Sequence, residues 1–161
     1  MKKREGYSLV EFAVIIAIMG IVVGLSALGF AYLTHANSKQ LASQINSGLS
    51  ELRSENMAKS TSSYLHIYSY DDVYYMKING DDVCQMDGTG TEIGSTEFAI
   101  AVDGNGLGDN ESYSFHIRKK DGAFTDVGAT CPAPSKITIK DDSGDEKTIV
   151  IVKDTGKHFI E

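Results

Sequence analysis

The residues Gly6-Tyr7-Ser8-Leu9-Val10-Glu11, with the apolar run that follows them, decide the architecture that this sequence predicts. Residues 12–33 carry no charged side chain, and a helix of that length measures about 33 Å, enough to cross hydrocarbon. Glu11 lies at the mouth of this run, where a charge costs roughly 2.5–3.5 kcal/mol at mid-bilayer and less near the edge. That cost predicts a specific role for Glu11.

The spacing of Tyr7 and Glu11 suggests a partner for the carboxylate. A cut after Gly6 would give Tyr7 a free α-amine, four residues before Glu11 on the same face of a helix. The amine and the carboxylate could then pair within one subunit or between neighbours. A secretory signal peptide is cut after its apolar region, whereas this cut would precede it and leave the apolar run on the mature chain.

This N-terminus resembles that of type IV pilins and the related pseudopilins. The resemblance is strongest over residues 1–33 and rests on the Lys2-Lys3-Arg4 leader, Gly6, Ser8-Leu9-Val10-Glu11 and the apolar run. It implies that a prepilin peptidase cleaves after Gly6, that Tyr7 is N-methylated, and that Glu11 pairs with a neighbour's N-terminus during filament assembly. The chain departs from the family pattern at Tyr7, where phenylalanine is commonest, and in having no proline within the apolar helix.

Small residues recur through the apolar run at steps of four and three, which places them on one stripe of a helix. Stripes of this kind let helices approach closely, and we expect this one to pack against other copies of the chain. Glycine and alanine are also frequent in membrane helices generally, so the stripe alone does not separate the two interpretations. The predicted helix-packing residues are Ala13, Ala17, Gly20 and Gly24.

The remainder of the chain predicts a second helical segment followed by strands. Apolar residues at 41, 45, 49 and 52 form one stripe, typical of an amphipathic helix over residues 34–60. From residue 62 the apolar period changes to that of strands. Strands are expected at residues 64–68, 73–78, 83–86, 97–102, 112–118, 136–140 and 148–153, with a short closing segment at 157–160.

These patterns predict an α+β fold class. The resemblance makes it pilin-like, with a long N-terminal helix, transmembrane over its first half, packed on an antiparallel β-sheet domain. The expected divisions are a basic leader at 1–6, a transmembrane and filament-core helix at 7–33, an amphipathic helix at 34–60 and an extracytoplasmic β domain at 61–161.

Composition narrows the functional classes. Removing residues 1–6 takes away three basic groups and one acid, so the formal charge falls from −7 to −9. An acidic chain is a poor candidate for direct nucleic-acid binding, which requires a basic face. The sequence has no nucleophile-elbow serine and no phosphate-binding loop, so we predict that the protein is not an enzyme.

The two cysteines, Cys84 and Cys131, are predicted to form a disulfide. The basic leader favours the cytoplasmic side, so the rest of the chain would face outward, where disulfides persist. Two unrelated buried thiols are the alternative. The predicted localisation is a single-pass membrane protein with a cytoplasmic N-terminus, which later forms a cell-surface or extracytoplasmic filament.

A glycine-rich stretch raises the question of calcium. Oxygen ligands alternate at Asp103 and Asn105, with Asp109 beyond, but the spacing does not match an EF-hand loop. A surface turn between two strands explains these residues equally well. The expectation is therefore that the protein needs no cofactor, with calcium at this stretch left open.

The resulting functional prediction is a structural subunit of a type IV pilus-like filament. Its expected partners are copies of itself or other pilins, a prepilin peptidase, an inner-membrane assembly platform and, before assembly, the membrane. One alternative is a minor, tip-type pseudopilin of a type II secretion or DNA-uptake (competence) system. Another is a membrane-anchored surface binding domain that never polymerises, which would keep its leader.

Overall fold

The computed structural model describes the backbone of residues 9–161 and the side chains of residues 11–19 and 38–161. The chain divides into two compact units, Met1–His35 and Ala36–Glu161. Helix α1, Leu9–Ala58, contributes to both units, and every strand that the structure describes belongs to the second.

In the second unit, α1 packs through the predicted apolar stripe. Its members step by four or three residues and therefore share one face of the helix. All are almost fully buried, at 1% exposure or less: Leu41, Ile45, Leu49 and Leu52. Burial of this stripe fixes which side of the helix meets the strands.

The first sheet contains five antiparallel strands in the order β3-β2-β1-β6-β7. Their bounds are β1 Tyr64–Tyr70, β2 Val73–Asn79, β3 Thr91–Ser95, β6 Ser112–Ile117 and β7 Phe124–Thr125. Asp71 and Asp72 join β1 to β2 with φ of 52° and 60°, the two positive values that a type I′ hairpin turn requires.

The second sheet is also antiparallel and five-stranded, in the order β10-β9-β8-β4-β5. Its strands are β4 Ala99–Val102, β5 Asn105–Gly106, β8 Lys136–Lys140, β9 Glu146–Val152 and β10 Lys157–Ile160. Buried and partly exposed residues alternate along β8, so one face of this sheet is turned to the interior.

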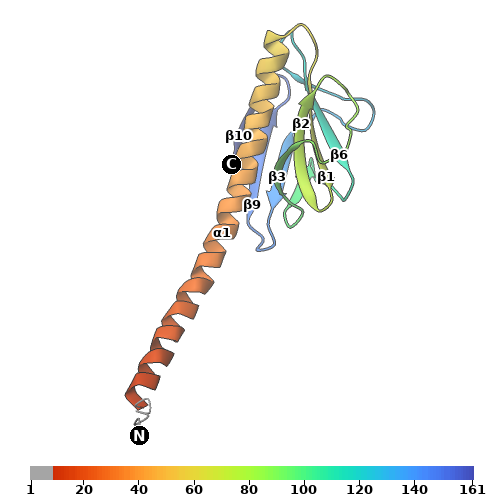
Figure 1. Cartoon of the computed structure of the whole chain (residues 1–161). Helices are drawn as coiled ribbons and strands as arrows, with labels where there is room; N and C mark the ends of the chain where they lie inside the picture. The colour runs from red at the N-terminus through yellow and green to blue at the C-terminus, as the bar shows by residue number, and fades with distance from the viewer. Residues whose placement is uncertain (1–8) are drawn as a thin grey trace. The chain divides into compact units, whose positions relative to one another are not determined.

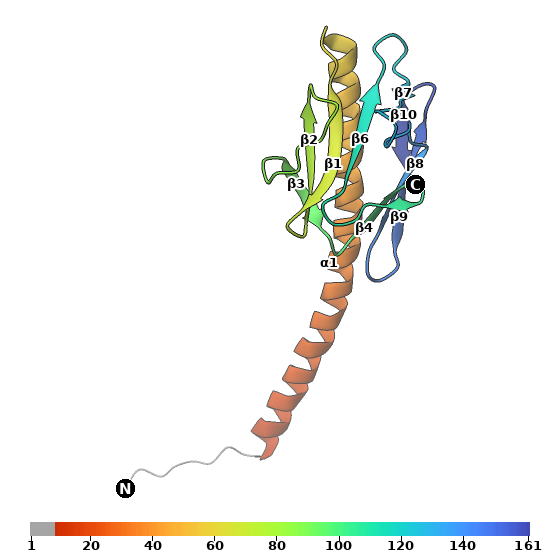
Figure 2. The same ribbon diagram turned by 90° about the vertical axis from the view of Figure 1, so that its right-hand side faces the viewer.

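One hydrophobic core serves both sheets and the helix. Leu65 of the first sheet, Ile137 of the second and Ile45 of α1 are all fully buried in the same cluster. In Figure 1 the strands of both sheets lie alongside the orange-to-yellow part of α1, and Figure 2 shows the green and blue sheets side by side against it. The second unit therefore depends on its helix as much as on its strands.

The predicted fold class needs correction. A helix packed on an antiparallel β-sheet domain was expected, and the structure has mostly antiparallel strands that form two five-stranded sheets. The connection from β3 to β4 moves the chain from the first sheet to the second, and β6 and β7 return it to the first before β8. Such crossings depend on tertiary contacts, which strand periodicity does not reveal.

The predicted transmembrane first half of the helix and the predicted single-pass membrane localisation are contradicted as well. Within the described residues, no helix is long and apolar enough to be a candidate membrane span.

Two strand predictions were also wrong. Residues 83–86 form no strand, and Thr91–Ser95 forms β3, which was not expected. Residues 80–90 instead form an irregular connection from β2 to β3. Lys136–Lys140 is confirmed as a strand with the expected bounds, and the closing segment Lys157–Ile160 forms strand β10.

Candidate functional site

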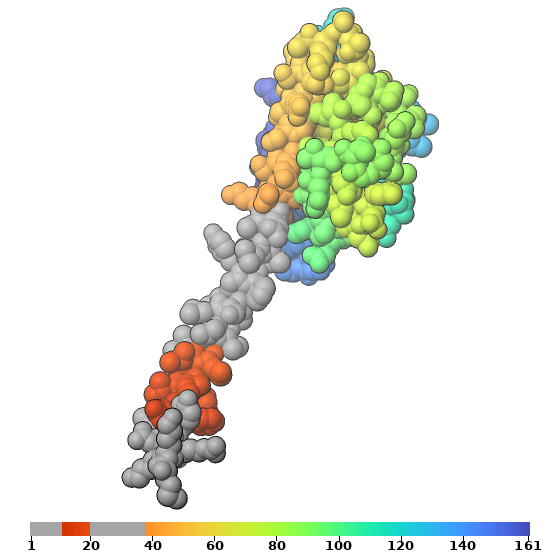
Figure 3. Space-filling model, in the orientation of Figure 1, coloured from red at the N-terminus to blue at the C-terminus, as the bar shows by residue number. Residues whose placement is uncertain are grey.

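The first candidate site is the apolar part of α1 at residues 11–19. All nine residues are exposed, and they can be followed in red in Figure 3. The large apolar side chains are Phe12, Val14, Ile15, Ile16, Ile18 and Met19, with exposed fractions from 43% to 64%. Exposed apolar surface of this kind marks a site of interaction.

These side chains are distributed unevenly around the helix. An α-helix turns about 100° per residue, so Ala13 and Ala17 share one narrow sector and the large residues occupy the others. Glu11 lies roughly on the far side, where Val14 and Ile15, three and four residues on, are its neighbours. The segment thus presents a shallow alanine side and a bulky side that carries one acid.

The structure accounts for only part of the predicted assembly set. Glu11, Ala13 and Ala17 are all exposed, consistent with surfaces available to another molecule. Gly6 and Tyr7, the predicted processing residues, lie outside the described residues, as do the surroundings of Gly20 and Gly24.

The second candidate site is the connection formed by residues 80–90, which we call the strap. Strand β1 is buried on both faces, with burial continuous from Leu65 to Ser69. Leu65 and Ile67 belong to the hydrophobic core. The alternating residues His66 and Tyr68 point the other way and make their contacts with the strap. The strap therefore covers the side of the first sheet that faces away from the core.

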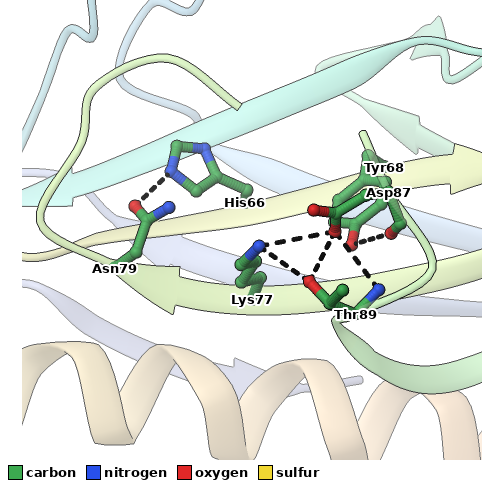
Figure 4. Close-up of polar contacts among 6 residues, drawn as sticks. All are labelled: His66, Tyr68, Lys77, Asn79, Asp87 and Thr89. Carbon is green, nitrogen blue, oxygen red and sulfur yellow. Dashed lines mark hydrogen bonds and ion pairs between the residues drawn. The ribbon is translucent and has the colours of Figure 1, made fainter. Parts of the chain in front are cut away.

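One end of the strap is held by His66, which is fully buried. Its Nε2 lies 2.9 Å from Asn79 Oδ1 and 3.0 Å from the Asp81 carbonyl oxygen, so this nitrogen donates. Its Nδ1 lies 2.7 Å from Ser114 Oγ on β6. Figure 4 shows the ring directed at Asn79, at the start of the strap. One imidazole thus ties the strap to two neighbouring strands.

The other end is held around Asp87 (Figure 4). Tyr68 Oη donates to the Asp87 carbonyl oxygen at 2.6 Å, and Thr89 Oγ1 donates to Asp87 Oδ1 at 2.6 Å. Lys77 Nζ donates to Thr89 Oγ1 at 2.9 Å and lies 3.4 Å from the Asp87 carboxylate. The Thr89 hydroxyl and amide, helped by Lys77, lower the pKa of Asp87, while burial raises the pKa of the Tyr68 phenol and keeps it a donor.

The two cysteines meet at the strap. The structure holds both as free thiols, so it does not contain the predicted disulfide; forming that bond is an oxidation and needs an electron acceptor. Both nevertheless line one cavity of about 180 Å³, between the strap and residues 127–131. Burial raises the pKa of the Cys84 thiol, and Cys131 is 8% exposed. The fold therefore places the two cysteines of the predicted disulfide at the same cavity.

The glycine-rich stretch has a structural role at Asp103. Its carboxylate accepts hydrogen bonds from the Ser135 and Lys136 amides, each at 3.0 Å, and from the Ser135 hydroxyl. Burial opposes ionisation of Asp103, but these donors outweigh it and the pKa is lowered. Asn105 and Asp109 are exposed, and no group of three metal-ligating His, Cys, Asp or Glu residues occurs among the described residues.

Comparison with protein-family models, with curated proteins and with solved structures found no match for this chain.

The strap contacts were missed by sequence reasoning. The Asn79-Gly80 turn and the polar residues His66 and Tyr68 within an otherwise apolar strand were the available indications. The partner of His66 on β6, Ser114, lies 48 residues further along the chain, and no spacing rule connects the two.

Proposed function

We propose that this protein is a structural subunit of a type IV pilus-like filament, processed after Gly6 and N-methylated at Tyr7. The observation that carries the proposal is the apolar segment at residues 11–19. All nine of its residues are exposed and can contact another molecule. The resemblance of the N-terminal motif supports further copies of this chain as that partner. The proposed role is structural and not enzymatic.

The shape of the segment suits packing between helices. The alanine side at Ala13 and Ala17 allows a neighbouring helix to come close, and large side chains such as Phe12 and Ile16 can fill the space beside it. Complete burial of a large apolar side chain contributes roughly 1.5–3 kcal/mol. Because these residues are about half exposed, assembly of several copies would gain a substantial part of that for each.

Glu11 would select and register the neighbours. A carboxylate taken into an apolar helix bundle is costly unless a cation compensates it, and the methylated amine of Tyr7 on an adjacent copy is such a cation. A subunit inserted out of register would leave both charges uncompensated. The pairing therefore supplies specificity that apolar packing alone lacks.

The experiment begins with the N-terminal peptide of the protein from its own cells, measured by mass spectrometry. Loss of residues 1–6 and one added methyl group on Tyr7 are expected. Electron microscopy of sheared surface material should then show filaments containing this chain as the main subunit. A retained leader would overturn the proposal, and a processed chain found only in trace amounts at filament ends would make it a minor subunit.

Two matched substitutions test the packing surface. Ile16 and Met57 lie on the same helix and are 55% and 57% exposed. Ile16→Lys should abolish filaments while processing continues, whereas Met57→Lys should leave filament yield close to that of the wild type. Equal filament yields from both variants would show that residues 11–19 are not the assembly surface.

A further inference from the structure

Cys84 and Cys131 lie in two irregular segments, and no strand pairing links one segment to the other. Cys84 lies in the middle of the strap, and Cys131 pairs with Val127 in an isolated bridge after β7. Both reach the same strand, β6. Ser112 and Ser114 of β6 line one cavity together with Cys84 and Cys131, and the Ser114 amide donates to Cys131 Sγ at 3.4 Å.

Ser112 and Ser114 are two residues apart on one strand and therefore point to the same face of the sheet. The Ser114 amide, which lies in the plane of the sheet, holds Cys131, while the side chains of Ser112 and Ser114 line the same 180 Å³ cavity as both cysteines. Cys84 is held there without help from Cys131, because His66 binds Asp81 and Tyr68 binds Asp87, on either side of Cys84 in the strap.

We propose that Cys84 and Cys131 form a redox latch, in which an intramolecular disulfide locks the strap onto residues 127–131. The oxidant is an external disulfide donor, either a small-molecule disulfide or an oxidised protein dithiol. This inference concerns the second unit and stands whether or not the chain forms filaments.

The exchange has two steps. The Cys84 thiolate attacks one sulfur of the donor, which forms a mixed disulfide and releases one donor thiol. The Cys131 thiolate then attacks the Cys84 sulfur and releases the second donor thiol. In sum, two cysteine thiols and one donor disulfide become one protein disulfide and two donor thiols.

The order of attack follows from exposure. Cys84 is partly exposed, whereas Cys131 is buried at 8% exposure and is the better placed resolving thiol. Because burial raises the pKa of Cys84, its thiolate is scarce near neutral pH and the first step should accelerate as the pH rises.

The test treats the folded full chain with oxidised glutathione and maps the products by mass spectrometry after alkylation. The wild type should lose two hydrogen atoms and give a linked Cys84–Cys131 peptide. Cys131→Ser should stop at a glutathione adduct on Cys84, and Cys84→Ser should leave Cys131 largely unmodified.

Hydrogen exchange provides the second readout. In the oxidised wild type, amides of residues 82–86 should exchange roughly tenfold more slowly than in the reduced form, because the bond suppresses local opening of the strap. The glutathione adduct of Cys131→Ser, which carries an oxidised Cys84 without a latch, should show no such protection.

Three outcomes would overturn the proposal. The first is a wild type that stops at the mixed disulfide, and the second is a product linked only between chains. The third is an internal bond that leaves exchange in the strap unchanged. A serine variant that does not fold is recognised by its far-UV spectrum, and Cys84→Ala or Cys131→Ala then replaces it.

Discussion

Asn56 and Ser63 exchange two hydrogen bonds across the connection between α1 and β1. Asn56 Nδ2 donates to the Ser63 carbonyl oxygen at 2.8 Å, and the Ser63 amide donates to Asn56 Oδ1 at 2.6 Å. Both residues are buried, with Asn56 at 0% exposure. The Asn56 side chain thus satisfies both the backbone amide and the backbone carbonyl of Ser63, as a neighbouring strand would in a sheet.

Asn56→Ala should lower the free energy of unfolding by about 2–4 kcal/mol. The substitution leaves a buried amide and a buried carbonyl without their partner, and each orphaned group costs about 1–3 kcal/mol. Chemical denaturation of the full chain measures the loss. The control is Ser47→Ala on the same helix, which removes only an exposed bond to the Ser43 carbonyl and should change stability by less than about 0.5 kcal/mol.

Gly156 is a second position where substitution should be severe. Its φ is +64°, and a β-carbon there would collide with the Gly122 carbonyl oxygen. Gly128 has a nearly identical φ of +63° but open space around it. Gly128→Ala should therefore lower the free energy of unfolding by about 1–2 kcal/mol, from backbone strain alone.

Gly156→Ala should exceed that value by a further 1–3 kcal/mol, roughly the cost of forcing extra atoms into a packed site. The comparison is made on thermal or denaturant unfolding of both variants. Equal losses would mean that the segment around Gly122 yields to the new methyl group without cost.

The free energy of unfolding should fall as the pH is lowered, because His116 becomes protonated. Burial, with a smaller contribution from Lys119, lowers the pKa of His116 below its usual 6.5. The ring stacks on Tyr64 at 4.7 Å, and its Nδ1 lies 2.8 Å from Thr125 Oγ1. Its buried Nε2 has no hydrogen-bond partner among the described residues, so protonation would leave a buried N–H unpaired.

The sign follows from proton binding. Between the lowered pKa and 6.5 the unfolded chain binds more protons at this position, so the free energy of unfolding falls as the pH drops through that window. Denaturation at about pH 8 and pH 5 should show a smaller loss for His116→Gln than for the wild type. An NMR titration midpoint for His116 at or above 6.5 would contradict the assignment.

Glu11→Ala should block incorporation into filaments without affecting processing at Gly6. The substitution would leave the Tyr7 amine of a neighbour uncompensated in an apolar environment, which is the costly case for a buried charge. Filament yield and the mass of the N-terminal peptide are measured together. Glu51→Ala, at an exposed acid on the same helix, is the control and should assemble normally.

Sequence patterns predicted the local parts of this structure better than its long-range parts. The stripe from Leu41 to Leu52 and the strand Lys136–Lys140 follow from periods of 3.6 and 2 residues, and each repeats often enough to be read. The Asp71-Asp72 hairpin is equally local, because two consecutive residues with positive φ determine it.

The partition into two sheets could not be derived in this way. Ile117 and Ile137 alternate identically in the sequence, yet they lie in different sheets. The candidate sites divide similarly. The exposed apolar segment can be anticipated from residues 11–19 alone, whereas the strap depends on side chains separated by up to 48 residues, as in the bond between His66 and Ser114.

The two sets of strap anchors become available at different times during synthesis. His66, Tyr68, Lys77 and Asp87 all lie within residues 66–87 and can associate as soon as the β1–β2 hairpin closes. Ser114, the partner of His66, leaves the ribosome later, and β6 must then add to the open edge of β1. Until that edge is paired, its backbone amides and carbonyls lack hydrogen-bond partners and can pair with a strand of another chain. The short loop closes quickly and the longer one slowly, so the emerging chain passes through a stage with half of the strap seated and one sheet edge exposed.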